Sequence, residues 1–272
     1  MRKSISTNTG GVKTASLPSY GAQLAALAAW YIPRYVRRHF HAVRCDRDGP
    51  APAISGPTVF FVNHSSWWDP AIGALFAARH YAGYRHYTPI DAAALNKYKI
   101  MKKLGFFPVD RNARSGARQF IEVCGRVFST PNAILWLTPE GRFRNVRSRP
   151  VAMKRGIGHL PAICPHLTFV PMAIEYTFDQ ESAAEVAVRF GGGIRVSQEP
   201  RRSAAEWTEF FSRRLEYEMD QLAAKVVHRH WNDFDIVQDG TSGVGGMYDL
   251  IRRTGAMIRG KPFASSHGED SH

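Results

Sequence analysis

The chain has 272 residues, of which 44% are hydrophobic and 22% charged. This composition excludes wholesale disorder, and the chain is long enough to bury a sizeable hydrophobic core. A formal net charge of +13 favours polyanionic partners, such as nucleic acid, an anionic bilayer or phosphorylated substrates, without choosing among them. The three cysteines, Cys45, Cys124 and Cys164, are widely spaced, which indicates a reducing compartment and excludes a zinc or disulfide framework.

The N-terminal part of the chain is less regular than its middle. Residues 1–16 are polar with scattered Lys and Arg, which predicts a disordered tail. Residues 17–47 predict a membrane-interfacial helical segment, because the apolar stretch at 24–32 is shorter than the roughly 18 residues of a spanning helix and basic residues follow it. A cleaved signal peptide is the competing interpretation. It is disfavoured, since the apolar stretch begins late and no small-residue cleavage site follows it.

The middle of the chain alternates short apolar runs with helical patterns. Residues 44–57 predict a loop, residues 58–62 predict a strand buried on both faces, and Asp69 followed by Pro70 predicts a helix start with Asp69 as N-cap. Further along we expect, in order, a strand at 84–88, helices at 92–104 and 115–128, a strand at 133–137, a strand at 169–174 whose proline indicates an edge or a bend, a hairpin of 186–190 and 194–197 around three glycines, and a long helix after the capping box at 203–206.

Strands that alternate with helices are typical of an α/β fold. The pattern predicts a single domain at residues 48–231, with a mixed, largely parallel central sheet flanked by helices. Residues 232–272 follow as a C-terminal basic extension. Within it, apolar residues interleave with Arg and Lys at 243–261, a basic amphipathic pattern compatible with anionic headgroups. A helix packed on the domain is the alternative for this segment.

The pair His64 and Asp69 directly follows the first buried strand. Ligand chemistry in α/β sheets gathers at the carboxyl ends of strands, and His64 lies two residues beyond such an end. A strand-to-helix turn can bring Asp69 back onto the imidazole, where its carboxylate would fix the tautomer and stabilise the imidazolium. The alternative is that Asp69 only caps the helix and that His64 is a satisfied polar group of the core.

Two further apolar runs end in charged residues. Gly105 opens a run that ends at Asp110 and Arg111, and the strand predicted at 133–137 is followed by Thr-Pro-Glu-Gly-Arg at 138–142. Arginine forks suit phosphate oxygens, and glycine lets the backbone approach a ligand closely. For each segment taken alone, an ordinary surface ion pair or an ordinary turn is the alternative.

In this order and spacing, the segments together resemble the four sequence blocks of the PlsC-like glycerolipid acyltransferase family. Residues 63–69 (NHSSWWD) resemble its N-H-x4-D block, and residues 105–111 are similar to its second block, which ends in an arginine. Residues 139–141 (PEG) match the core of its third block, and residues 169–172 resemble the fourth, with the proline in place. The resemblance covers residues 57–200.

The resemblance implies transfer of a fatty acyl group from acyl-CoA or acyl carrier protein to a lipid hydroxyl, without a metal, a resident cofactor or a covalent acyl-enzyme. It implies that His64 is the general base and that Asp69 orients it. The residues expected to bind the substrate are Gly105, Arg111, Glu140, Gly141, Arg142, Lys154 and Pro171. The chain departs from the family in the third block, where Arg-Phe-Arg at 142–144 stands in place of Thr then Arg, so which arginine meets the substrate stays open. For Lys154, a solvated basic turn is the alternative.

A lipid acceptor implies work at an anionic membrane surface, so we expect the protein at the cytoplasmic face of the cell membrane, peripheral or monotopic. The expected acceptor is a lysophospholipid of the 1-acylglycerol-3-phosphate type. A hydroxyl on a carotenoid or hopanoid glycoside or on a lyso-aminolipid is the competing acceptor, because of the altered third block and the paired Trp67 and Trp68. A non-catalytic nucleic-acid-binding protein would explain the charge, but the usual motifs are missing from the sequence, so no nucleic-acid partner is expected.

Overall fold

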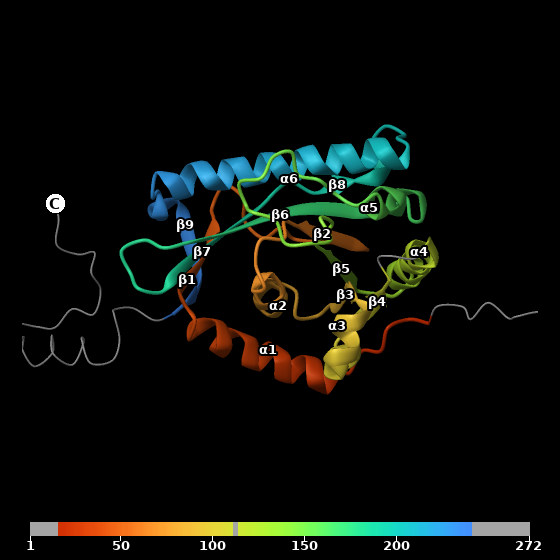
Figure 1. Cartoon of the computed structure of the whole chain (residues 1–272), viewed down its shortest axis with the longest axis horizontal. Helices are drawn as coiled ribbons and strands as arrows, with labels where there is room; N and C mark the ends of the chain where they lie inside the picture. Colours follow the sequence, from red (N-terminus) through yellow and green to blue (C-terminus); the bar gives the residue numbers. More distant parts are fainter. Residues whose placement is uncertain (1–15, 111–113, 241–272) are drawn as a thin grey trace, which may run out of the picture.

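The computed structural model describes residues 16–110 and 114–240. The tail predicted at 1–16, apart from Ser16, and the amphipathic pattern at 243–261 therefore lie outside the described residues. Within them, nine strands form one sheet in the order β4-β3-β5-β2-β6-β7-β1-β9, with β8 paired to β6 (Figure 1). The strands are β1 Phe40–Asp46, β2 Thr58–Val62, β3 Arg85–Asp91, β4 Phe106–Val109, β5 Ala133–Leu137, β6 Thr168–Thr177, β7 Ala184–Phe190, β8 Ile194–Arg195 and β9 Phe234–Asp239.

The five strands from β4 to β6 run parallel to one another. β7 pairs with β6 in the antiparallel sense, β1 is parallel to β7, and β9 is antiparallel to β1. The prediction of a single α/β domain with a mixed, largely parallel sheet is confirmed. The sheet is wider than the predicted domain at 48–231, because β1 precedes that range and β9 follows it.

Helices cover both faces of this sheet (Figure 1). The helices are α1 Ala22–Arg37, α2 Asp69–His80, α3 Ala92–Lys97, α4 Arg114–Phe128, α5 Gly156–His159 and α6 Ala204–Val227. Alternate residues of β2 enter two separate cores: Val59 and Phe61 pack on the side of α4 and α6, whereas Phe60 and Val62 pack on the side of α2. Because side chains alternate along a strand, a sheet covered on both faces needs an apolar residue at every position.

Helix α6 begins at the predicted capping box. The Ser203 hydroxyl accepts a hydrogen bond from the Glu206 N–H, and the Glu206 carboxylate accepts one from the Ser203 N–H. Trp207, Phe211 and Leu215 then repeat every four residues, so they share one side of the helix and are buried against the sheet. Local capping and apolar periodicity agree here, which is why the sequence predicts this helix well.

The strand that contains Pro171 was expected at an edge or a bend, and the edge position is wrong. β6 lies inside the sheet, between β2 and β7. The Pro171 carbonyl accepts a hydrogen bond from the Gly191 N–H, so the proline nitrogen faces the break between β7 and β8, where no ladder bond is required of it. The expected hairpin is also wrong, because β7 and β8 pair in succession with β6 and residues 191–193 carry the chain between them.

Tertiary contacts overrule local patterns at two further places. The helix expected at 92–104 ends at Lys97 and continues as a 3-10 turn, Lys99–Lys103. The carbonyls of Lys102 and Lys103 accept hydrogen bonds from the Ser19 hydroxyl and the Gly21 N–H, so the segment before α1 holds this turn. The loop expected at 44–57 begins inside β1, whose apolar residues are buried by pairing with β7.

Candidate active site

His64 and Asp69 meet at the carboxyl end of β2. The chain leaves β2 at Val62, turns through residues 63–68 and enters α2 at Asp69. This turn places the His64 Nδ1 atom 2.8 Å from the Asp69 Oδ2 atom. The Asp69 side chain is 1% exposed, whereas that of His64 is 17% exposed. A buried carboxylate at Nδ1 favours the tautomer with its proton on Nδ1, which leaves the lone pair of Nε2 for a proton from a substrate.

The Asp69 carboxylate is itself held by three donors. Oδ2 accepts the His64 ring bond and a second bond from the Ser66 N–H at 3.0 Å, and Oδ1 accepts a bond from the Tyr176 hydroxyl at 2.8 Å. The prediction of Asp69 as a helix N-cap is wrong, because α2 begins at Asp69 and its N-cap position is Trp68 without a capping side chain. The carboxylate turns back to the His64 loop instead of bonding the first turn of the helix.

Tyr176 was not singled out in the sequence. It lies near the carboxyl end of β6, which is parallel to β2 and adjacent to it, so both strand ends reach the same edge of the sheet. Burial, followed by the charge of Asp69, raises the pKa of the Tyr176 hydroxyl, which keeps it protonated as a donor. Knowing that the two strands are neighbours is the signal that would have found it.

The loop after β5 fixes the backbone of His64 through hydrogen bonds. The His64 N–H donates to the Glu140 carboxylate at 2.9 Å, and the His64 carbonyl accepts from the Arg144 N–H at 2.8 Å. The Arg144 Nε atom lies 3.7 Å from the second carboxylate oxygen of Glu140. Burial raises the pKa of Glu140, and the bond from the His64 amide acts in the opposite direction. Glu140 therefore positions the histidine, and its expected contact with substrate stays a prediction.

Gly141 and Lys154 lie side by side at the rim of this loop. Gly141 has a φ of +68°, and a Cβ atom there would meet the Lys154 Cγ atom at 3.2 Å, so the position requires glycine. The Lys154 N–H donates to the Pro139 carbonyl at 2.8 Å, and its side chain is exposed. The close approach at Gly141 is to the lysine stem, while the lysine charge stays at the surface.

The two arginines that follow Gly141, Arg142 and Arg144, differ in their surroundings. Arg144 is partly buried against Glu140, whereas Arg142 is exposed and has no hydrogen-bond or ion-pair partner in the part of the chain that the structure describes. Phe143 stands between these two arginines in the sequence. The centroid of its ring lies 4.3 Å from the centroid of the His64 ring. Of these two arginines, Arg142 is thus the one available to an anion, and Phe143 covers part of the imidazole.

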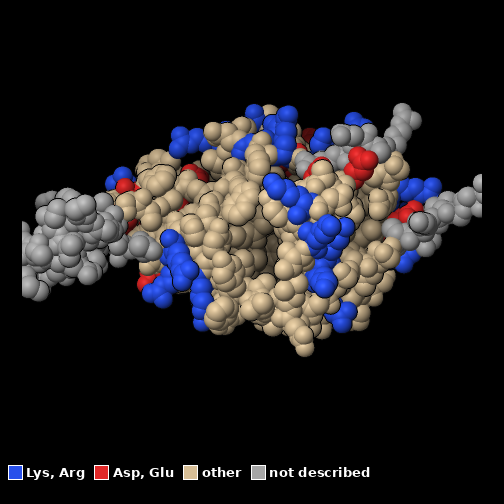
Figure 2. Space-filling model, turned by 60° about the horizontal axis from the view of Figure 1, so that its bottom comes forward, with Lys and Arg blue, Asp and Glu red and all other residues tan. Residues whose placement is uncertain are grey.

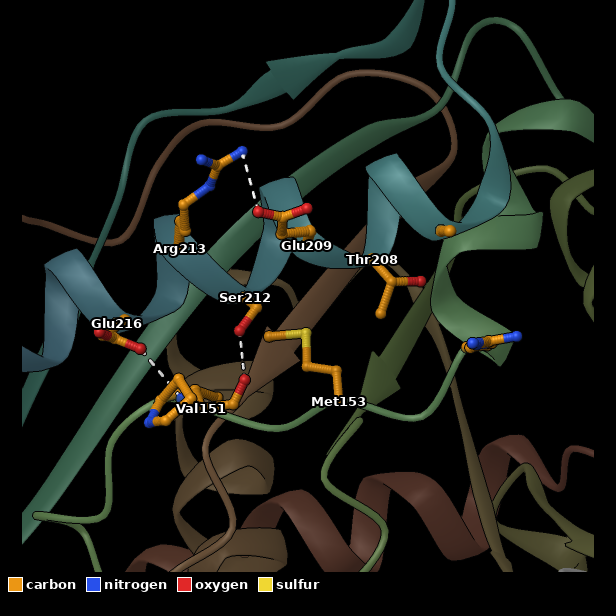
Figure 3. A pocket seen from close by; sticks show the side chains of 10 residues that line it. Val151, Met153, Thr208, Glu209, Ser212, Arg213 and Glu216 are labelled. Carbon is orange, nitrogen blue, oxygen red and sulfur yellow. Dashed lines mark hydrogen bonds and ion pairs between the residues drawn. The ribbon is translucent and has the colours of Figure 1, made fainter.

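A hollow of about 510 Å³ lies between α6 and residues 150–155 (Figure 3). Figure 3 shows the Ser212 and Glu216 side chains pointing from α6 toward Val151. Ser212 donates to the Val151 carbonyl, and Glu216 accepts from the Val151 N–H at 2.9 Å. His64 and Asp69 do not line this hollow. Its polar bonds fasten the segment that carries Lys154 to α6.

A family model described as Acyltransferase matches residues 33–175, which is more than half of the chain. The matched range contains His64, Asp69 and Glu140. The chain belongs to the PlsC-like acyltransferase family. This membership confirms the resemblance of the four sequence blocks and supports lipid O-acyl transfer as the general activity. A search among curated proteins finds no match.

Two residues of the acyltransferase blocks are buried by packing within the sheet. Gly105 precedes β4 and so lies at the amino end of that strand, opposite to the edge that carries His64. Its φ is +82°, and a Cβ atom there would meet the His86 carbonyl oxygen at 2.1 Å, so packing against β3 requires this glycine. Pro171 is buried inside β6, paired with Phe61. The structure thus gives Gly105 and Pro171 packing roles in the sheet, and their expected contacts with substrate stay predictions.

Other residues of the blocks have different outcomes. Arg111, predicted to bind the acceptor, lies outside the described residues. The Asn63 side-chain amide makes a reciprocal pair of bonds with the backbone of Ile174, at 2.9 Å to the carbonyl and 2.8 Å from the N–H. This pair of hydrogen bonds connects the end of β2 to β6 at the residue that precedes His64. In the described part of the chain, no three His, Cys, Asp or Glu side chains gather as a metal site.

The side of the acyltransferase domain on which α1 lies has an extended area without Lys, Arg, Asp or Glu. Figure 2 brings that side forward and shows Lys and Arg side chains in separate groups around an extended area of other residues with a hollow near its middle, while acidic side chains lie near the margins. The exposed apolar residues of α1 include Leu27, Trp30 and Tyr31. No helix within residues 16–110 and 114–240 has both the length and the apolar character needed to cross a bilayer.

Proposed function

We propose that this acyltransferase moves a fatty acyl group from the thioester of acyl-CoA or acyl carrier protein to the hydroxyl of a lysophospholipid of the 1-acylglycerol-3-phosphate type. The supporting observation is the 2.8 Å bond between His64 Nδ1 and the buried Asp69 carboxylate, at a strand end where the ring is still partly exposed. An imidazole oriented in this way has the geometry of a general base for a hydroxyl nucleophile.

The reaction then needs one proton relay. As the acceptor oxygen attacks the thioester carbonyl carbon, its proton passes to His64 Nε2, and Asp69 stabilises the imidazolium that forms. The tetrahedral intermediate collapses by breaking the carbon–sulfur bond, and the thiolate takes the proton from the imidazolium. The products are an ester and a free thiol. Because the thioester already carries the activated acyl group, the step requires no resident cofactor.

The loop after β5 supplies the groups for the acceptor. Arg142 is exposed beside Gly141, and the exposed Lys154 follows on the next segment, so both can meet a phosphate at the rim of the site. Arginine offers a planar fork that suits phosphate oxygens, and lysine adds a point charge. Arg111 is proposed to join them, as the family block implies. Fixing the headgroup would make the attack of the hydroxyl effectively intramolecular.

The acceptor is proposed to reach the protein from an anionic membrane surface, with the protein peripheral or monotopic at the cytoplasmic face. α1 supports this part of the proposal, because apolar side chains on its exposed side and arginines near its C-terminal end are typical of an interfacial helix.

A lipid acceptor without a phosphate is the second candidate. Phe143 is exposed, and its ring centroid lies 4.3 Å from that of the His64 ring, so it gives the imidazole an aromatic rim; Trp67, also exposed, follows three residues after His64. An aromatic rim suits an apolar alcohol or a glycoside better than a small charged headgroup. An acceptor panel that includes such lipids decides between the two candidates.

The test uses the purified full-length chain with labelled acyl-CoA and a panel of lyso-lipids, with products read by mass spectrometry. We expect acylation of the lysophosphatidate-type acceptor, and we expect His64→Ala to lower the rate by about 10³-fold or more while the fold is kept. His166→Ala is the matched control, because His166 is exposed and lies in the loop between α5 and β6. A fully active His64→Ala enzyme would refute the mechanism.

A further inference from the structure

A groove of about 440 Å³ lies between the C-terminal half of α1, the end of α2 and β9. Its lining includes Trp30, Arg34 and Arg37 of α1, Arg79 of α2 and Gln238 of β9. None of the described residues that line it is acidic, so three arginines face one hollow without a carboxylate in its wall. The groove shares no residue with the loop of His64 or with the loop after β5.

Neutral acceptors hold two of these arginines in place. The Arg34 guanidinium lies 4.1 Å above the centre of the Trp30 ring, and its Nη1 atom donates to the Trp30 carbonyl at 2.6 Å. Arg79 Nη2 donates to the Gln238 side-chain oxygen at 2.9 Å. Neutral acceptors orient a guanidinium without cancelling its charge, and each fork keeps other N–H groups for an anion. Arg34 and Arg79 therefore both keep their positive charge at the groove.

The groove adjoins the exposed apolar side of α1. Leu27, Trp30, Tyr31 and Arg34 follow at intervals of three, one and three residues, so they lie along one side of the helix. Trp30 and Tyr31 are exposed, and Arg34 comes one turn later. An apolar stripe that ends in arginines is the arrangement of a helix at the bilayer interface, with its arginines at the level of the lipid phosphates. In Figure 2 one group of basic side chains lies at the left, on the side where Figure 1 places the end of α1.

The same end of α1 packs against the loop of the catalytic pair. The Trp68 ring, next to Asp69, lies 5.3 Å from the Tyr35 ring and 4.9 Å from the His39 ring, between centroids. The orientation of α1 on a surface therefore sets the orientation of the His64 loop.

We propose that the groove of Arg34, Arg37 and Arg79 binds the phosphate of an anionic lipid headgroup, and that this lipid is an anchor and not the acceptor. The proposal rests on the membrane-surface part of the proposed function but on none of its chemistry. One lipid held at the end of α1 orients the domain, while the acceptor enters at the other loops.

The experiment measures sedimentation of the full-length chain with vesicles of phosphatidylcholine, alone or mixed with phosphatidylglycerol, at constant ionic strength. The test variant is Arg34→Gln/Arg79→Gln. The matched control is Arg126→Gln/Arg201→Gln, which removes two exposed arginines from α4 and from the segment before α6. Each arginine near an anionic bilayer raises the vesicle-binding affinity by a factor of about five. We therefore expect the test variant to bind the mixed vesicles about 25-fold more weakly than the wild type, and the control variant to stay within about threefold of the wild type.

Further results separate the explanations. Equal losses in the test and control variants would show a general charge effect and overturn the proposal, as would wild-type binding by the test variant. Release of the protein from the mixed vesicles by inorganic phosphate, at a concentration equal to that of the lipid phosphate, would also overturn the proposal. The groove would then bind free phosphate in place of a headgroup. The rate with a short-chain, monomeric lysophospholipid should be unchanged in the test variant. A wild-type enzyme that binds the mixed vesicles but transfers no acyl group would sink the proposed function and leave this site standing.

Discussion

Replacing Tyr176 with phenylalanine removes the hydroxyl that donates to the carboxylate of Asp69, the residue proposed to orient His64. The Tyr176 hydroxyl donates to Asp69 Oδ1 at 2.8 Å, whereas the other two donors to this carboxylate both bind Oδ2. The variant therefore leaves one oxygen of a buried carboxylate without its donor. The carboxylate can then rotate away from the geometry in which Oδ2 faces His64 Nδ1.

The magnitude follows from the strength of such a bond. A hydrogen bond to a charged group contributes about 1.5–3 kcal/mol, and partial exposure of Tyr176 lowers this to about 1–2 kcal/mol. If the loss falls on the transition state, kcat decreases about 5- to 30-fold. We expect KM to stay unchanged, because Tyr176 contacts Asp69 and not the substrate loops.

The assay follows release of free CoA thiol under steady-state conditions, with thermal unfolding measured in parallel. Tyr84→Phe is the matched control, because the Tyr84 hydroxyl donates to the Ile54 carbonyl at 3.1 Å, far from the site in sequence, and its loss should affect stability alone. In the background of Asp69→Asn the effect of Tyr176→Phe should largely vanish, since both changes act through one carboxylate. Equal kcat values for Tyr176→Phe and Tyr84→Phe, or fully additive effects, would contradict the argument.

Two more predictions follow from the same contacts. Asp69→Asn should lower kcat by about 10³-fold or more, because an amide favours the wrong tautomer of His64; a mere capping role predicts only about 1 kcal/mol of lost stability and a normal rate, which unfolding and rate measurements on the one variant separate. His86 accepts from the Trp136 indole N–H and bonds the Tyr81 carbonyl, and burial lowers its pKa from 6.5 to about 4. Because the folded pKa lies below the unfolded value, the unfolded chain takes up more protons between these values, and the stability held above pH 6.5 is lost as the pH falls toward 4. Urea unfolding should show a fall of about 2 kcal/mol between pH 7 and pH 5 that is missing in His86→Gln; equal falls in both proteins would rule His86 out as the cause.

Strands and helices whose ends are marked by local chemistry were predictable. β2 and β5 are uninterrupted apolar runs between turn residues, and α6 follows its own capping box. Elements defined by distant partners were not. β1 and β9 depend on each other and on β7, and the break after Lys97 depends on the segment that precedes α1. In these places the deciding hydrogen bonds join residues far apart in sequence, which no local window contains.

The site divides in the same way. His64 and Asp69 could be paired from sequence, because they are only five residues apart in the turn from a strand end to a helix start, which returns the carboxylate to the ring. Glu140 and Gly105 were both expected at the substrate. The structure shows Glu140 bonded to the His64 amide and Gly105 packed against the His86 carbonyl. A glycine or a carboxylate in a motif has the same letters whether it contacts a ligand or the protein itself.

The amino-acid sequence by itself determined the class of the fold, the acyltransferase family and the identity of the histidine and its carboxylate, because these depend on residue type, apolar pattern and short spacing. Tertiary structure alone decided which side chains support that pair. Tyr176 reaches Asp69 because β6 lies beside β2, and the groove lined by Arg34, Arg37 and Arg79 exists because α1, α2 and β9 converge. The physical reason is that neighbours in a sheet are chosen by packing and backbone pairing over the whole chain, and this choice is made between segments that the sequence keeps more than one hundred residues apart.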